Sequence, residues 1–151
     1  MDMTTRTAEN VDLSRLDMAL GFLLRIAQLK IYERFFEDVG EKQFKPGEFS
    51  VLWVISRNPG IRQSVLGQTL MIKRAHMTKL IRALEDQGLV SRRIPDEDRR
   101  AVEITVTAEA ERRMREAADW FFSYEDAVGT DLTAAERQQL TVLLRKFTGL
   151  G

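Results

Sequence analysis

Basic side chains recur between residues 73 and 79, at positions that leave one face of a helix apolar. In a helical segment Met77, Ile81 and Leu84 share one side, so the basic residues point away from it. A guanidinium can donate two parallel hydrogen bonds to O6 and N7 of guanine, and any cation can pair with a phosphate. A solvated helix face without a ligand is the alternative interpretation. The residues of this segment that could contact nucleic acid are Lys73, Arg74, His76, Thr78 and Lys79.

A second basic pair, Arg99 and Arg100, stands between two runs of β-branched residues with alternating polarity, 89–93 and 102–107. These runs predict a hairpin with both arginines in its loop. An arginine at a loop tip can enter a narrow, A·T-rich minor groove, where the negative potential is enhanced. The alternative is a charged turn in which the three acids at 96–98 only neutralise the two arginines.

The elements around these two basic groups predict how they are positioned. A short helix is expected over residues 63–70 and a longer one over 73–87, with Gly88 where a helix favours a left-handed residue after its end. Together with the hairpin, this order predicts a helix-turn-helix followed by a wing. Such an arrangement places the second helix in a major groove of DNA while the hairpin loop touches the neighbouring minor groove.

A long helix is predicted before this region, capped by Asp12 or Ser14 and reaching about Asp38. It carries two apolar stripes at helical spacing, whereas a helix on the surface of its own core needs only one. We therefore expect it to contact both the rest of the chain and another subunit. The first stripe is Leu16, Leu20, Leu23, Ala27 and Ile31, and the second is Phe22, Ile26, Leu29 and Phe36.

Three more helices are expected from local start and stop signals. Pro46 should open a helix that residues 58–60 end. Thr107 should cap a long helix that reaches about Val128, and the pattern at 133–136 is that of a capping box. The last helix then presents large apolar residues at heptad-like spacing, namely Leu140, Leu143, Leu144 and Phe147.

The charge distribution favours a nucleic-acid partner although the net charge is zero. Residues 62–100 hold nine Lys and Arg against five Asp and Glu, a net +4, whereas residues 1–61 and 101–151 carry −1 and −3. Positive charge is therefore concentrated in the predicted helix-turn-helix and wing, as expected for a segment that contacts phosphate. Chance clustering is the alternative.

Other function classes find little support in the composition. The chain has no Cys and a single His, His76, which excludes disulfides and leaves no good set of zinc ligands. It also lacks a phosphate-binding glycine loop and a nucleophile elbow, so we expect no catalytic residue, no metal and no cofactor. The N-terminus has no apolar signal core, and no apolar run reaches roughly 18 residues, so a cytoplasmic protein is expected.

The helix-turn-helix and wing segments resemble the MarR family of winged-helix transcriptional regulators. Residues 98–107 match in full that family's wing pattern, D-x-R-x-x-x-[LI]-x-[LV]-T. Gln63, Leu66 and Leu70 fit the family's pattern for the first helix, and residues 85–92 fit E-x-x-G-L-V-x-R. With the flanking helices included, the resemblance covers most of the chain.

The resemblance implies roles for two wing residues: Arg100 is inserted into the minor groove, and Asp98 holds its guanidinium. Three positions depart from the family pattern. Gly67 replaces the usual alanine, Met71 replaces the usual turn glycine, and an Ala-His pair at 75–76 replaces a polar pair. Met71 then needs either a turn without positive φ or a strained backbone.

The resemblance also implies an effector crevice between the dimerisation helices and the winged region. The ligands expected there are phenolic or aromatic carboxylates. An arginine beside apolar walls suits a carboxylate, because it can form forked hydrogen bonds. The candidate effector-binding residues are Arg25, Gln28 and Trp53. The alternative is that Trp53 belongs to the core and Arg25 is an ion-pair partner at an interface.

The predicted fold is mainly α (α+β), a winged helix-turn-helix with long N- and C-terminal dimerisation helices. Residues 1–11 should form a flexible tail and residues 12–151 a single unit, with dimerisation helices at 12–40 and 108–151 and the winged region at 45–107.

The predicted function is a sequence-specific DNA-binding transcriptional regulator. We expect a homodimeric repressor on a pseudo-palindromic operator, released by a small aromatic carboxylate or a thioester derived from one. One alternative is a winged-helix protein–protein interaction module without DNA binding. The other is a constitutive regulator with no effector.

Overall fold

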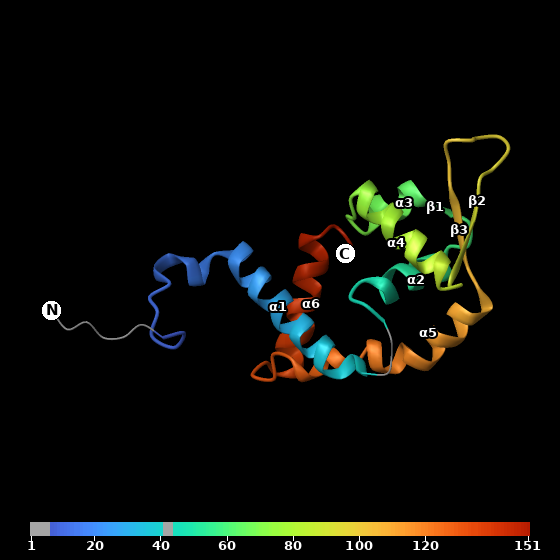
Figure 1. Ribbon diagram of the computed structural model, residues 1–151. Helices are drawn as coiled ribbons and strands as arrows, with labels where there is room; N and C mark the ends of the chain where they lie inside the picture. Colours follow the sequence, from blue (N-terminus) through green and yellow to red (C-terminus); the bar gives the residue numbers. More distant parts are fainter. Residues whose placement is uncertain (1–6, 41–43) are drawn as a thin grey trace.

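The computed structural model describes residues 7–40 and 44–151. A winged region lies at one end of the molecule, and the N-terminal segment extends away at the other end (Figure 1). In chain order the elements are η1 (Ser14–Met18), α1 (Leu20–Val39), α2 (Glu48–Arg57), β1 (Ile61–Arg62), α3 (Gln63–Thr69), α4 (Arg74–Asp86), β2 (Val90–Arg93), β3 (Glu103–Val106), α5 (Ala108–Phe121), η3 (Tyr124–Ala127) and α6 (Ala134–Phe147). The expected class, mainly helical with a small winged sheet, is confirmed.

A contiguous apolar core lies beneath the winged region. Helix α4 sends one face into it, as its spacing predicts, and α2 and strand β3 close the core from the other sides. Burying a large apolar side chain is favourable by about 1.5–3 kcal/mol, so this core is the main source of stability for the region. Its fully buried members include Phe49, Leu52, Ile55, Leu66, Met77, Ile81, Leu84, Leu89 and Ile104.

The sheet has three antiparallel strands in the order β1-β3-β2. The pairing of β2 with β3 confirms the predicted hairpin, with Arg92 opposite Ile104. Strand β1 has only two residues and was not predicted, because so short a segment shows no alternation. Its pairing of Ile61 with Ile104 joins the start of α3 to the wing strand.

Both predicted reader helices are confirmed, with ends within a residue or two of the expected ones. Lys73 is the N-cap of α4, and Gln87 is its C-cap. Gly88 follows with φ +70°, a value that glycine adopts without the steric penalty of a Cβ. The amide of Leu89 then donates to the Leu84 carbonyl, which closes the helix and starts the chain toward β2.

The prediction of one helix from residue 12 or 14 to residue 38 is wrong at its start. Asp12 Oδ1 accepts a 2.7 Å hydrogen bond from the Ser14 amide, and Ser14 itself has φ +51°. This local turn leads into the short 3-10 helix η1, and Ala19 is extended before α1 begins at Leu20. Of the predicted tail, residues 1–6 lie outside the described residues, and residues 7–10 form a hydrogen-bonded turn.

Pro46 precedes α2 instead of occupying its first turn. Gly47 is the N-cap of this helix with φ +85°, a conformation suited to glycine. Glu48, the first helical residue, is buried, and its Oε2 accepts the Lys45 amide at 2.9 Å. The end of α2 at residues 58–60 is as predicted.

Helix α5 begins at the predicted cap but ends earlier than expected. The Thr107 hydroxyl accepts the Ala110 amide, whereas the helix stops at Phe121 and not near Val128. Ser123 donates its hydroxyl to the Asp119 carbonyl, a local bond that competes with helix continuation. The capping box of α6 is present, with Thr133 and Glu136 bonding each other's amides.

A group of aromatic rings joins α1 to the winged region. Phe35 is the only buried residue of α1 as described, and its ring contacts Trp120 and Tyr124 at centroid distances of 5.4 and 5.6 Å. Phe121 continues the contacts by stacking on Phe49 of α2 at 4.0 Å. Neither predicted stripe of the first helix included Phe35.

Candidate nucleic-acid interface

Helix α4 presents its predicted contact residues to solvent. Lys73, Arg74, His76 and Lys79 are all exposed, because Met77, Ile81 and Leu84 take the buried side of the helix. Among the described residues, none of these four basic side chains forms an ion pair. The charges of Lys73, Arg74 and Lys79 are therefore available to a ligand.

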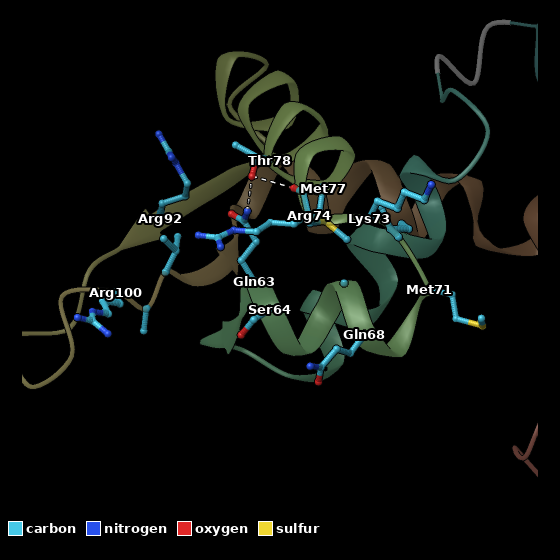
Figure 2. Close-up of a pocket in the computed structure, with 14 residues that line it drawn as sticks. Gln63, Ser64, Gln68, Met71, Lys73, Arg74, Met77, Thr78, Arg92 and Arg100 are labelled. Atoms are coloured by element: carbon cyan, nitrogen blue, oxygen red, sulfur yellow. Dashed lines mark hydrogen bonds between the residues drawn. The ribbon is translucent and has the colours of Figure 1, made fainter.

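A cleft of about 830 Å³ opens between the two reader helices and the base of the wing. Figure 2 shows Arg74 and Gln63 on its helical side and Arg100 on its wing side. The cleft thus brings together residues that are 26 positions apart in the chain, Arg74 and Arg100, as the winged-helix prediction requires. Its lining residues are Gln63, Ser64, Gly67, Gln68, Met71, Ile72, Lys73, Arg74, Met77, Thr78, Arg92, Arg100, Ala101 and Val102.

The Thr78 hydroxyl has two partners inside the protein. It donates to the Arg74 carbonyl and accepts from Gln63 Nε2, both at 3.0 Å (Figure 2). The sequence predicted Thr78 as a direct contact and did not select Gln63. These bonds tie the start of α3 to the second turn of α4, so Thr78 helps to set how the reader helix is held.

The wing loop is organised by turns around a buried proline. Pro95 is fully buried, and its carbonyl accepts the Asp98 amide at 3.2 Å. The Asp98 carbonyl in turn accepts the Ala101 amide at 3.0 Å. Arg99 and Arg100 lie within this second turn and are exposed.

The Asp98 carboxylate differs from its expected role. It was expected to hold the guanidinium of Arg100, but Oδ1 accepts the Arg100 backbone amide at 3.2 Å. Its other oxygen pairs with Nη1 of Arg62 at 3.2 Å. Within the described part of the chain, neither Arg99 nor Arg100 forms an ion pair with the acids at 96–98.

Two other arginines of the wing are committed to carboxylates. Arg92 donates to Glu85, a hydrogen bond that raises the pKa of Arg92, and Arg93 donates in the same way to Glu103, which raises the pKa of Arg93. Both guanidiniums remain charged but are shared with an acid. Among the residues that the structure describes, the cations of this face without an ion pair are therefore those of α4 and the wing turn.

The turn between α3 and α4 contains a strained residue. Met71 has φ +54°, and its side chain is 92% exposed. Met71 therefore has the strained backbone, and not the turn without positive φ that was the other possibility. At the other unusual position, a Cβ on Gly67 would lie 3.2 Å from the Ile72 carbonyl oxygen, so glycine relieves a tight contact at this turn.

The candidate effector residues are not brought together by contacts within the described residues. Trp53 stacks on Phe49 at 5.8 Å and meets Phe122 edge to face at 4.9 Å. The arginine over its ring is Arg57, at 4.5 Å from the centroid, and not Arg25. Arg25 and Gln28 are both exposed on α1.

The spacing of four between Trp53 and Arg57 on one helix was the signal that could have found this pair.

The described residues contain neither a metal-binding cluster nor a helix that could span a membrane. No cluster of three or more His, Cys, Asp or Glu that could hold a metal occurs in residues 7–40 and 44–151. No helix in those ranges is both long enough and apolar enough to cross a membrane.

Comparison with known proteins supports the predicted resemblance. The model of the MarR family matches residues 44–102, which include α2, both reader helices and most of the wing. The chain is therefore similar to the MarR family, as its wing pattern predicts. This similarity agrees with the predicted fold and with the predicted class of function, a winged-helix transcriptional regulator.

Individual relatives extend this similarity beyond the winged region. The chain is 29% identical over 129 residues to a candidate transcriptional regulatory protein for the hcr operon of Thauera aromatica, covering 85% of this chain and 78% of the relative. The repressor CouR bound to a 23-mer DNA duplex superposes with a TM-score of 0.82 at 29% identity, covering 92% of this chain and 99% of the other. CouR bound to p-coumaroyl-CoA gives a TM-score of 0.78 at 28% identity, covering 92% and 98%.

Proposed function

We propose that this protein is a homodimeric repressor that binds duplex DNA through α4 and the wing, and that a small effector releases it. The observation that carries the proposal is the cleft, where Arg74 of the reader helix and Arg100 of the wing meet on one exposed face. CouR, at 29% identity over nearly the whole fold, is described as a repressor and was solved on DNA, which supports this reading.

Base recognition is assigned to α4. Arg74 lies in its first turn, where a reader helix meets base edges, and an arginine there can bind guanine O6 and N7. Lys73, His76 and Lys79 supply phosphate contacts around it. Thr78 supports the helix from within and contacts DNA only if its internal bonds are exchanged.

The wing contributes Arg100 to the minor groove, with Arg99 beside it on the same turn. Both side chains are exposed and without an acidic partner in the described residues, so each can approach the negative potential of a narrow groove. Asp98 holds the turn and not the guanidinium.

Pairing of two chains is assigned to the segments 12–40 and 108–151. The apolar side chains Leu20, Leu23, Leu140 and Phe147 are exposed in the single chain. Apolar surface of this kind favours association, and a two-fold dimer makes each subunit read one half of a pseudo-palindrome. The half-sites then lie about one helical turn apart.

A titration of duplex binding tests the DNA assignment. The probe is the duplex that the purified protein selects from a random-sequence library. Raising the salt from about 50 to about 200 mM should lower the affinity by roughly three orders of magnitude, because bound phosphates release counterions. A protein–protein interaction module would bind no duplex in this way, and binding without salt dependence would contradict the proposal.

Arg100→Ala separates the wing from general electrostatics in the same titration. It should weaken binding about ten- to a hundredfold while the thermal midpoint stays unchanged, because Arg100 is exposed. Arg115→Ala, on α5, removes the same charge from an exposed position outside the cleft and serves as the control. Equal affinities for the two variants would overturn the minor-groove role.

The effector is assigned to the chemical class of aromatic carboxylates and their thioesters. CouR, which was solved with p-coumaroyl-CoA, supports that class. Arg25 and Gln28 are the proposed polar partners, with Trp53 on the apolar side. Because Arg57 already covers Trp53, it is a second candidate for the carboxylate partner.

Effector-induced release from the selected duplex tests these assignments. With a panel of aromatic acids and their thioesters, Arg25→Ala should abolish release without affecting DNA binding itself, and Arg57→Ala is the matched comparison. Normal release from the Arg25→Ala protein would reject Arg25. A panel in which no compound changes DNA affinity would instead favour a constitutive regulator.

A further inference from the structure

The carboxylate of Asp98 uses both of its oxygens to connect the wing to the reader helices. One oxygen accepts the backbone amide of Arg100 at 3.2 Å, and the other pairs with Nη1 of Arg62 at 3.2 Å. Arg62 is the N-cap of α3, so the contact runs from the first reader helix to the wing turn that carries Arg100.

The position of Arg62 makes this contact significant for the wing. In the backbone ladder that holds β1 against β3, Arg62 lies opposite Glu103 at the base of the hairpin. The loop between Arg93 and Glu103 extends beyond that ladder, so its position relative to α3 depends on contacts such as this one. The Arg62–Asp98 pair is the one ion pair between the wing loop and the reader helices among the described residues.

The pair also controls a charge on the face proposed to meet DNA. Asp98 is partly exposed and lies two residues from Arg100, so an unpaired carboxylate there would repel phosphate. Surface ion pairs add little to folding stability, because water and salt screen them. Loss of the pair should therefore reduce DNA affinity more than it reduces stability.

We propose that Arg62 is a positioning residue for DNA binding, which neutralises Asp98 and through it holds the turn that presents Arg100 to the minor groove. The inference rests on the proposed function of the wing. It adds a residue that acts through another residue and lies outside the family's wing pattern, 36 positions before Asp98.

A double-mutant cycle of Arg62→Ala and Asp98→Asn tests this role on the duplex selected by the wild-type protein. Arg62→Ala alone should weaken binding about three- to tenfold, with an unchanged thermal midpoint. Asp98→Asn keeps an oxygen for the Arg100 amide but loses the ion pair with Arg62, so it should also weaken binding. The double variant should then bind as tightly as Asp98→Asn alone.

The cycle distinguishes positioning from a direct phosphate contact of Arg62. If Arg62 bound phosphate itself, the double variant would be weaker than Asp98→Asn by the same factor that Arg62→Ala costs in the wild type. That additive result overturns the inference. Arg62→Lys, which keeps the charge, should recover part of the affinity.

A minor-groove probe adds a measurement that a merely structural role would not change. Replacing adenine by diaminopurine where the wing binds places an amino group in the minor groove, as guanine does. Wild-type protein should bind this duplex more weakly than the parent duplex, and Arg62→Ala should discriminate less between the two.

Arg100→Ala serves as the reference in both experiments. It tests the proposed function of the wing separately from the role of Arg62. If it binds the parent duplex as the wild type does, the proposed function of the wing fails. If Arg100→Ala is weak while Arg62→Ala binds and discriminates as the wild type does, only the role of Arg62 is overturned.

Discussion

The winged region buries its large apolar residues, whereas the terminal helices leave many of theirs exposed. In the winged region Leu52, Ile81 and Ile104 have no exposed surface, and the core closes within one chain. Helix α6 has no buried residue, and its Leu143 and Phe147 are 54% and 65% exposed. Both regions consist mainly of regular helices, so the difference lies in packing and not in local structure.

This contrast shows how the two regions depend on the number of chains. The core of the winged region is complete in one chain, so its stability should not depend on protein concentration. The apolar faces of α1 and α6 remain uncovered, and exposed apolar surface of this extent marks an interaction site. We therefore expect the terminal helices to gain their stability from pairing.

Ending the chain before Leu132 should produce the largest effect. The truncation removes α6 with its stripe of apolar residues. It leaves uncovered the apolar surface that α6 would contact in the dimer. We expect aggregation or loss of folding, measured by light scattering. A stable monomer of the truncated chain that still binds DNA would contradict the pairing role of α6.

A charge placed on α6 should separate the two chains without the loss of folding expected of the truncation. Leu143→Glu changes a residue that is already exposed in the single chain, so a monomer would tolerate it. We expect it to abolish the dimer in sedimentation experiments, because it places a charge in an apolar interface. Gln138→Glu, also exposed on α6, adds the same charge as a control, and equal behaviour of the two variants would count against the interface.

A cavity in the winged core should behave in the opposite way. Ile81→Ala removes buried methylene groups from the centre of the core and should lower the free energy of unfolding by about 2–5 kcal/mol. The loss should be the same at low and high protein concentration, as measured by urea denaturation of the monomer–dimer mixture. A loss that disappears at high concentration would mean that this core also depends on pairing.

The strained turn of the reader helices offers a smaller and stabilising change. Met71→Gly should raise the free energy of unfolding by about 1 kcal/mol, because glycine adopts φ +54° freely and the methionine side chain is almost fully exposed. Met71→Ala keeps the Cβ and is the matched control, with no gain expected. Equal stability of the two variants in thermal denaturation would show that the turn is not strained.

The aromatic junction between the two regions should produce a small alkaline effect. Burial raises the pKa of Tyr124 from 10.0 to about 12, and the neighbouring Glu125 adds to the rise. The protonated phenol is thus favoured in the fold, so its contribution is present below pH 10 and is lost as the pH rises through about 12. Tyr124→Phe should remove this part of the alkaline loss of stability, as followed by denaturation at several pH values.

Local signals allowed the sequence to predict much of the fold. Gly88, Thr107 and the capping box at 133–136 each act within one turn of chain, and each is found where it was expected. The start of the first helix was wrong for the same reason, since the turn at Asp12 and Ser14 satisfies the capping signal without starting the helix.

The candidate site was predicted in its residues and less well in its contacts. The exposure of Arg74 follows from the spacing of its apolar neighbours, and that of Arg100 from its place in the hairpin loop, both of which the sequence contains. The pairing of Arg62 with Asp98 and of Gln63 with Thr78 depends on how distant segments pack, so no local pattern could predict it. These tertiary contacts decide which polar groups remain free for a ligand.

Hydroxyl-radical footprinting of the selected duplex shows whether two paired chains read DNA with α4 and the wing. We expect two-fold symmetric protection, with half-sites about one helical turn apart and flanking minor-groove protections that Arg100→Ala removes. A single asymmetric footprint, or flanking protections that persist in Arg100→Ala, would contradict it.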